Sequence, residues 1–166
     1  MYAGWVERLE VFTPKLLEGC RRLYAERLVT LAIFGSWARE AATPCSDLDL
    51  LIVAEDLPRG RGRRLREFET VEEETLPVRF VWGGDYPAVS LSPVIKTPEE
   101  VLVGSPLFLD MTDWCRLLWD RDGFFAEYLA GLRERMKKLG ARRRWAKGGY
   151  YWEYKPDLQP GENIEL

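Results

Sequence analysis

The sequence predicts an α/β or α+β fold in which a mixed sheet of four to five strands is flanked by helices and followed by an aromatic C-terminal extension. Two apolar runs, Leu28 to Phe34 and Asp47 to Val53, favour neighbouring strands because such runs are typical of buried strands. Residues 77–82, 88–95 and 116–120 are expected to be the remaining strands.

Helices are predicted where start signals precede regularly spaced apolar residues. Thr13 is expected to cap a helix whose first residue is Pro14, and Thr97-Pro98 is a second start of the same kind. Gly140 is expected to end the last long helix. The predicted helices cover residues 13–27, 63–74, 98–103, 106–115 and 124–139. We expect them on one face of the sheet.

The length and composition indicate one domain. With 166 residues, 46% hydrophobic and 31% charged, the chain is large enough to bury a sizeable core. It divides into an N-terminal helical segment, a core, a C-terminal helix and an aromatic and basic tail. Their bounds are 1–27, 28–122, 123–140 and 141–166.

Composition excludes several kinds of chemistry. The sequence contains no histidine, which rules out Ser-His-Asp and Cys-His catalysis and leaves carboxylates and metal. Three scattered cysteines argue against a disulfide framework and a zinc site. A net charge of −3 gives no general attraction to nucleic acid. Because no apolar run reaches the length of a membrane span and no secretory leader is visible, we expect a cytoplasmic protein.

Two carboxylates and a glycine-serine turn lie close together in the sequence. Asp47 and Asp49 occupy alternate positions of a strand, so their side chains point the same way and repel each other unless a cation lies between them. Oxygen ligands at this spacing suit Mg²⁺, which takes further ligands from phosphate. Gly35-Ser36 lies before a short helix-compatible stretch whose first N–H groups can bind an anion. Together they predict binding of a nucleoside triphosphate.

These residues resemble the signature of the DNA polymerase β-like nucleotidyltransferase superfamily, and most of all its small "minimal" members. The resemblance covers Gly35-Ser36, Ala38-Arg39 and Ser46 to Leu50, within residues 28–54. It implies transfer of a nucleoside monophosphate from an NTP to an unknown hydroxyl acceptor, with Mg²⁺ or Mn²⁺ as the cofactor.

The resemblance also implies roles for individual residues. Asp47 and Asp49 are expected to be the catalytic residues and to hold the metal. The residues expected to bind the nucleotide are Gly35, Ser36, Arg39 and Ser46.

One feature of the active members is missing from the matching position. They carry a third carboxylate on a later strand, whereas the run from 88 to 95 offers Ser90 and Ser92. Asp85 and Glu74 are candidate substitutes. The alternative function is therefore a weakened or inactive nucleotide-binding protein, the antitoxin-like partner of a small helical toxin. A homodimer is also compatible with the sequence, and no membrane association is expected.

Two basic stretches leave alternatives open. Four arginines at 59, 61, 63 and 64 form either a solvated helix start or a rim that attracts triphosphate or RNA. In the tail, cations alternate with aromatics, which fits base stacking and an RNA-binding module, but also packing on the core or a dimer contact. Gly148-Gly149 resembles a hairpin turn. If the tail folds back, Tyr150 or Trp152 could stack the nucleotide base.

Overall fold

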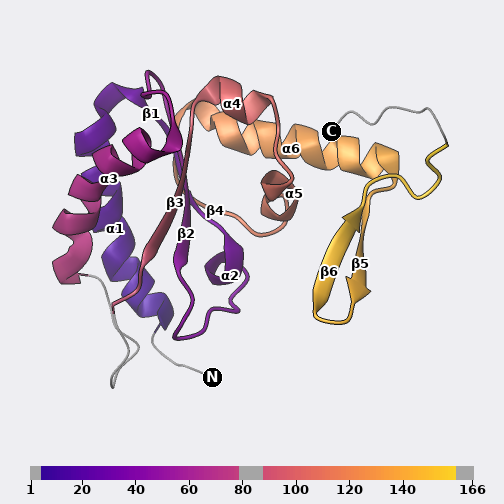
Figure 1. The fold of residues 1–166 in the computed structure, drawn as a ribbon, viewed down its shortest axis with the longest axis horizontal. Coiled ribbons are helices and arrows are strands. Elements are labelled where there is room, and N and C mark those ends of the chain that lie inside the picture. Colours follow the sequence, from indigo (N-terminus) through magenta and orange to yellow (C-terminus); the bar gives the residue numbers. More distant parts are fainter. Residues whose placement is uncertain (1–4, 79–87, 160–166) are drawn as a thin grey trace.

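A mixed four-stranded sheet forms the centre of the protein, for which a computed structural model describes residues 5–78 and 88–159. The strand order is β3-β2-β1-β4, with β1 antiparallel to both neighbours and β2 parallel to β3 (Figure 1). The strands are β1 (Leu28–Ile33), β2 (Leu48–Ala54), β3 (Leu91–Lys96) and β4 (Arg116–Asp120). The predicted mixed sheet is confirmed, and its first two strands are neighbours.

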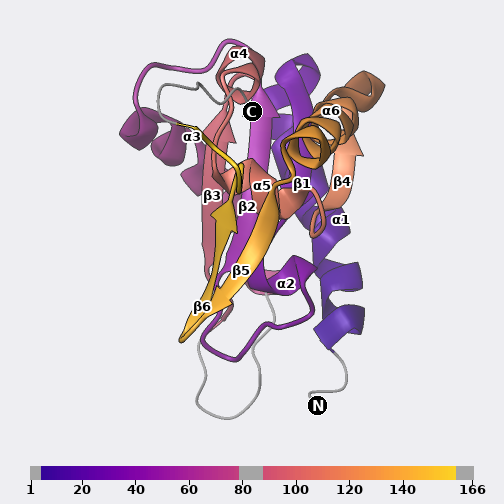
Figure 2. The same ribbon diagram turned by 90° about the vertical axis from the view of Figure 1, so that its right-hand side faces the viewer.

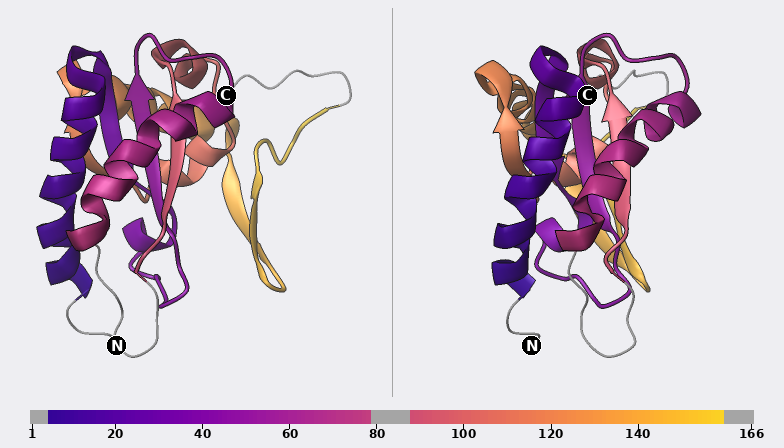
Figure 3. Two further views of the ribbon diagram at one scale, coloured as in Figure 1. Left: turned by 60° about the vertical axis from the view of Figure 1, so that its left-hand side comes forward. Right: turned by 90° about the vertical axis from the view of Figure 1, so that its left-hand side faces the viewer.

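Helices cover both faces of this sheet. The long helices α1 (Trp5–Tyr24) and α3 (Arg61–Thr75) lie against each other on one face, as Figure 3 shows. The opposite face carries α4 (Pro98–Leu102), α5 (Leu107–Met111) and α6 (Phe124–Leu139). The expectation of helices on one face is therefore wrong.

The physical reason lies in β2, which is buried on both sides. Leu48, Leu50 and Ile52 pack in the core under α1 and α3, whereas Leu51 and Val53 pack in the core under α5 and α6. Each of these side chains is fully buried. A strand with apolar residues at consecutive positions needs cover on both faces.

The first helix is longer than its start signals predict. Helix α1 begins at Trp5 and runs through Thr13 and Pro14, so Thr13 is not its N-cap. Upstream, Leu9 and Phe12 are almost fully buried. Their burial is worth about 1.5–3 kcal/mol each, which together offsets the roughly 3 kcal/mol that an internal proline costs.

The other start and stop signals give a mixed result. Thr97 caps α4 in a capping box: its backbone N–H donates to Glu100 (3.0 Å), and the Glu100 N–H donates to its hydroxyl (3.3 Å). Gly140, at φ +69°, ends α6 as predicted. Helix α5 is shorter than expected. The strand predicted over 77–82 begins instead as a 3₁₀ turn, Leu76–Val78, and its remainder lies outside the described residues. Two further 3₁₀ turns are Ala25–Arg27 and Arg121–Gly123.

The tail forms a two-stranded antiparallel hairpin from β5 (Arg142–Ala146) and β6 (Gly149–Glu153). It stands on the α5 and α6 side of the sheet, and its tip points toward the end of the sheet where α2 (Gly35–Ala38) lies (Figures 1 and 2). The hairpin interpretation of the glycine pair is thus confirmed. None of the helices in the described ranges is long and apolar enough to span a membrane.

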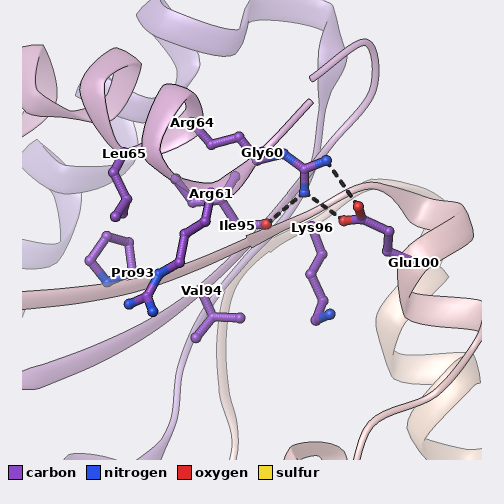
Figure 4. A pocket seen from close by; sticks show the side chains of 9 residues that line it. All are labelled: Gly60, Arg61, Arg64, Leu65, Pro93, Val94, Ile95, Lys96 and Glu100. Atoms are coloured by element: carbon purple, nitrogen blue, oxygen red, sulfur yellow. Dashed lines mark hydrogen bonds and ion pairs between the residues drawn. The ribbon is translucent and has the colours of Figure 1, made fainter. Parts of the chain in front are cut away.

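The outer edge of β3 is protected against pairing with another strand. The Leu48 N–H donates to the Ser90 carbonyl, so from Ser90 onward every second residue of β3 turns its backbone N–H and carbonyl groups toward β2. The backbone groups of Pro93 and Ile95 therefore point away from the sheet. Pro93 has no N–H to offer, and Arg64 donates to the Ile95 carbonyl (3.0 Å) while pairing with Glu100 (Figure 4). A cavity of about 440 Å³ lies beside this strand, and none of the predicted site residues lines it.

Candidate functional site

The turn after β1 lies directly against the carboxylate of Asp49. Gly35 adopts φ +69°, and a methyl group on it would come within 2.1 Å of Asp49 Oδ2. The Phe34 N–H donates to the Asp49 carbonyl (3.1 Å), which ties the turn to β2. Only glycine fits here, because the position combines a left-handed backbone with a close approach. The predicted glycine-serine turn and the predicted carboxylate of Asp49 therefore lie directly opposite each other.

Asp49 carries a partly desolvated charge. Burial raises the pKa of its carboxyl, as does the negative charge of Asp47, while a hydrogen bond from Ser92 and the charge of Arg39 act in the opposite direction. Asp49 is half-buried and Asp47 is exposed. Asp47 precedes the first residue of β2 by one position, so only Asp49 lies within the strand. The two carboxylates interact unfavourably, which a bound cation would relieve.

The residues present fit a divalent cation through two carboxylates. Asp47 and Asp49 would hold it, and phosphate and water would complete its shell. In the described ranges no cluster of three acidic, cysteine or histidine side chains forms a metal site. The β3 residue beside Asp49 is Ser92, in agreement with the sequence.

The two candidate substitutes for a third carboxylate stand differently. Glu74 forms an ion pair with Arg22, where α3 packs on α1 near Gly19. That contact lies on the face of the sheet away from Asp49, which occupies the same side of β2 as Leu51 and Val53. Glu74 as a substitute is therefore wrong. Asp85 lies outside the described residues and stays a prediction.

The other predicted nucleotide-binding residues lie around this turn. Ser36 is in α2, and Arg39 follows α2, its N–H donating to the Gly35 carbonyl (3.2 Å). Ser46 closes the loop before β2: its hydroxyl accepts from the Thr43 N–H (2.9 Å). The structure thus brings Gly35, Arg39 and Asp49 together and gives Ser46 a role in shaping the loop.

A cluster beside Arg39 was not predicted. The Arg143 guanidinium lies over the ring of Trp114 at 3.9 Å and over that of Trp152 at 4.5 Å, and it pairs with Asp113 at 2.8 Å. Arg39 also reaches the Trp114 ring, at 5.8 Å. The alternation of cations and aromatics in the tail was visible in the sequence. Their partner before β4 was not, because it is about thirty residues away.

The arginine cluster at the start of α3 lies elsewhere. Helix α3 follows the end of β2 at Ala54, five residues and about 16 Å along the strand from Asp49. Arg64 is only 12% exposed and holds Glu100 and the Ile95 carbonyl. Its assignment to a rim for triphosphate is wrong. For the other three arginines, the functional interpretation stays a prediction.

A left-handed glycine turn lies against Asp49, the aspartate within the neighbouring strand, at one end of a mixed sheet. This is the arrangement that the resemblance to nucleotidyltransferases implies. The comparison with known families agrees with this class. The nucleotidyltransferase domain model matches residues 14–100, and the chain belongs to this family. The predicted enzyme class, a nucleotidyltransferase, is confirmed.

Individual relatives were found by sequence and by structure. "Putative protein adenylyltransferase MJ1305" of Methanocaldococcus jannaschii is 27% identical over 127 residues, which are 75% of this chain and 81% of that protein. A chain in the structure of a tri-AMPylated Shewanella oneidensis HEPN toxin in complex with MNT antitoxin is 13% identical, with a TM-score of 0.47, and the match covers 79% of this chain and 92% of that chain. Spectinomycin adenyltransferase of Enterococcus faecialis is 16% identical, with a TM-score of 0.41, covering 87% and 55%.

Proposed function

We propose that the protein transfers AMP from Mg²⁺-bound ATP to a hydroxyl group of a protein acceptor. The contact between Gly35 and the Asp49 carboxylate carries the proposal, because it places a carboxylate suited to bind a cation beside the backbone N–H groups of the Gly35-Ser36 turn. The choice of ATP and of a protein acceptor draws on the relative from Methanocaldococcus jannaschii, which bears the name of a protein adenylyltransferase.

The reaction is an in-line exchange at the α-phosphorus. The acceptor oxygen forms a bond to this phosphorus, the bond to the β-phosphate oxygen breaks, pyrophosphate leaves, and the hydroxyl proton passes to water. Asp47 and Asp49 would hold the cation, which would supply positive charge beside the leaving group. Gly35 and Ser36 orient the β- and γ-phosphates through backbone N–H groups, with the positive charge of Arg39 beside them.

Label transfer tests this function directly. The protein is incubated with ATP labelled at the α-phosphate and Mg²⁺ or Mn²⁺, with cell lysate as the source of acceptor, and labelled protein is resolved on a gel. Asp49→Ala should remove both the label and Mg–ATP binding in calorimetry. Asp157→Ala, an exposed carboxylate in the tail, serves as the control. Unchanged Mg–ATP affinity in Asp49→Ala would refute the proposal.

A second candidate function is nucleotide binding without catalysis, in a protein that acts as the partner of a toxin-like protein. Ser92 favours it, since a hydroxyl stands beside Asp49 where the resemblance implies a third carboxylate. This candidate predicts Mg–ATP binding that depends on Asp49, but no label on any protein of the lysate. Ser92→Asp then provides a further test, since restoring transfer would identify the missing carboxylate as the cause.

A further inference from the structure

The tail hairpin stands on the side of the sheet toward which the carboxylates point. Asp49 alternates with Leu48 and Leu50, which face α1 and α3, so its side chain emerges on the other side. Figures 1 and 2 agree that β5 and β6 stand on that other side, with their tip toward the end of the sheet that carries α2. The hairpin is therefore placed to face a nucleotide bound at Asp49.

The base of the hairpin is fixed to the core. The Arg143 guanidinium lies over the rings of Trp114 and Trp152 and pairs with Asp113. The Trp152 indole N–H donates to Asp110 (2.9 Å). These contacts join both strands of the hairpin to α5 and the residues after it, so the hairpin is held in place. The Trp152 ring already contacts Arg143 and Asp110 and is not available for stacking on a ligand.

The tip of the hairpin presents an uncovered indole. Trp145 pairs with Tyr150 across the strands, so both lie on the same face as Arg143 and Trp152. The Trp145 ring meets the Tyr150 ring edge to face at 5.2 Å, yet Trp145 is 76% exposed. Tyr150 in turn lies 6.4 Å from Trp114, which Arg39 reaches.

These contacts form a continuous row from the phosphate-binding turn to the hairpin tip. The row runs from Arg39 through Trp114 and Tyr150 to Trp145. Of its three rings, those of Trp114 and Tyr150 are partly buried, and that of Trp145 is largely exposed to solvent. Arg39 marks the phosphate end of the proposed nucleotide site. A flat, apolar ring at the other end of the row is suited to the remaining part of a nucleotide, its base.

We propose that Trp145, supported by Tyr150, stacks on the base of the nucleotide whose phosphates lie at Gly35 and Asp49. This inference rests on the proposed function and adds a binding residue from outside the matched family region, residues 14–100. Of the two rings named from the sequence for this role, Trp152 is occupied by Arg143 and Asp110, and Tyr150 supports rather than caps the base.

Stacking also sets the selectivity of this site. Every base has a π-face, so stacking tolerates all four nucleotides, and purines, with two fused rings, cover more of an indole than pyrimidines. ATP and GTP should bind more tightly than CTP and UTP, and Trp145→Ala should narrow that difference.

The test separates the base from the phosphates. Calorimetry measures the affinity of the full chain for Mg–ATP and for Mg–tripolyphosphate, which has the phosphates but no base. Trp145→Ala should weaken Mg–ATP by about tenfold, the scale of one stacked base, and leave Mg–tripolyphosphate unchanged. Trp145→Phe, which keeps a ring, should recover most of the loss. Tyr151→Ala is the matched control, because Tyr151 is 58% exposed on the opposite face of the same hairpin.

Each outcome decides between the two proposals. Equal Mg–ATP affinity in the wild type and Trp145→Ala would overturn the stacking role and leave the proposed function standing. Equal loss of both ligands would also overturn it, because Trp145 would then act through the fold. Failure of the wild type to bind either ligand would refute the proposed function and the stacking role with it.

Discussion

Replacing Gly35 by alanine separates the backbone strain at the turn from the contact with Asp49. At φ +69° an alanine costs about 1–2 kcal/mol, so the melting temperature should fall by about 2–8 °C in a chain of this size. The new methyl group would lie 2.1 Å from Asp49 Oδ2, whereas real contacts of this kind are at least 3.0 Å, so the carboxylate has to move by about 1 Å. A displacement of that size at a reacting centre costs about a hundredfold in rate.

The matched control is Gly123→Ala. Gly123 has φ +72°, and a methyl group there would meet nothing within 4 Å. Both variants should lose melting temperature, followed by circular dichroism, because both force alanine into the same backbone region. The loss in Gly35→Ala should be at least as large as in Gly123→Ala, because only Gly35→Ala adds a clash with Asp49. Only Gly35→Ala should lose Mg–ATP affinity and label transfer. Equal Mg–ATP affinity and equal transfer in the two variants would refute the reasoning about the turn.

Three further predictions concern charge and capping. Burial raises the pKa of the Asp49 carboxyl above its usual 3.8, so the ionised carboxylate destabilises the folded protein at pH 7. Asp49→Asn removes this charge and should raise the melting temperature at pH 7. The gain should vanish as the pH falls through the raised pKa, because wild-type Asp49 then becomes neutral as well. Mg²⁺ should stabilise the wild type but not this variant. The triple variant Arg59→Ser, Arg61→Ser, Arg63→Ser should leave Mg–ATP affinity unchanged. A clear loss of Mg–ATP affinity in this variant would place those arginines at the site. Thr97→Ala should cost about 1 kcal/mol, or about 2–4 °C, in thermal melts, with Thr97→Ser close to wild type.

The parts of the site that sequence could predict are those encoded within a short stretch. Gly35 follows the end of β1 by two positions, and Asp49 lies fourteen positions further on in the neighbouring strand β2, so the spacing brings them together once both strands form. Their contact is a property of the local turn and of strand pairing. The same holds for the Thr97 cap and for Gly140, whose signals act within one helical turn.

The parts that sequence did not predict depend on distant partners. The contact of the Arg143 guanidinium with the Trp114 ring joins the hairpin to the residue before β4, and no local sequence pattern links Arg143 with Trp114. At the N-terminus, Thr13 and Pro14 predict a helix start, but the helix begins upstream because it buries Phe12 in the core. Cover on both faces could have been predicted, because residues 48–54 include consecutive apolar positions rather than an alternation.

The protected outer edge of β3 limits how two copies of the chain can associate. A second sheet that approached this strand would meet a proline in place of one donor and an arginine already bound to one carbonyl. Continuous pairing of strands between copies is therefore blocked on that side. Among the described strands, a dimer formed by joining sheets would have to pair at β4, the other edge of the sheet, or at an outer edge of the hairpin.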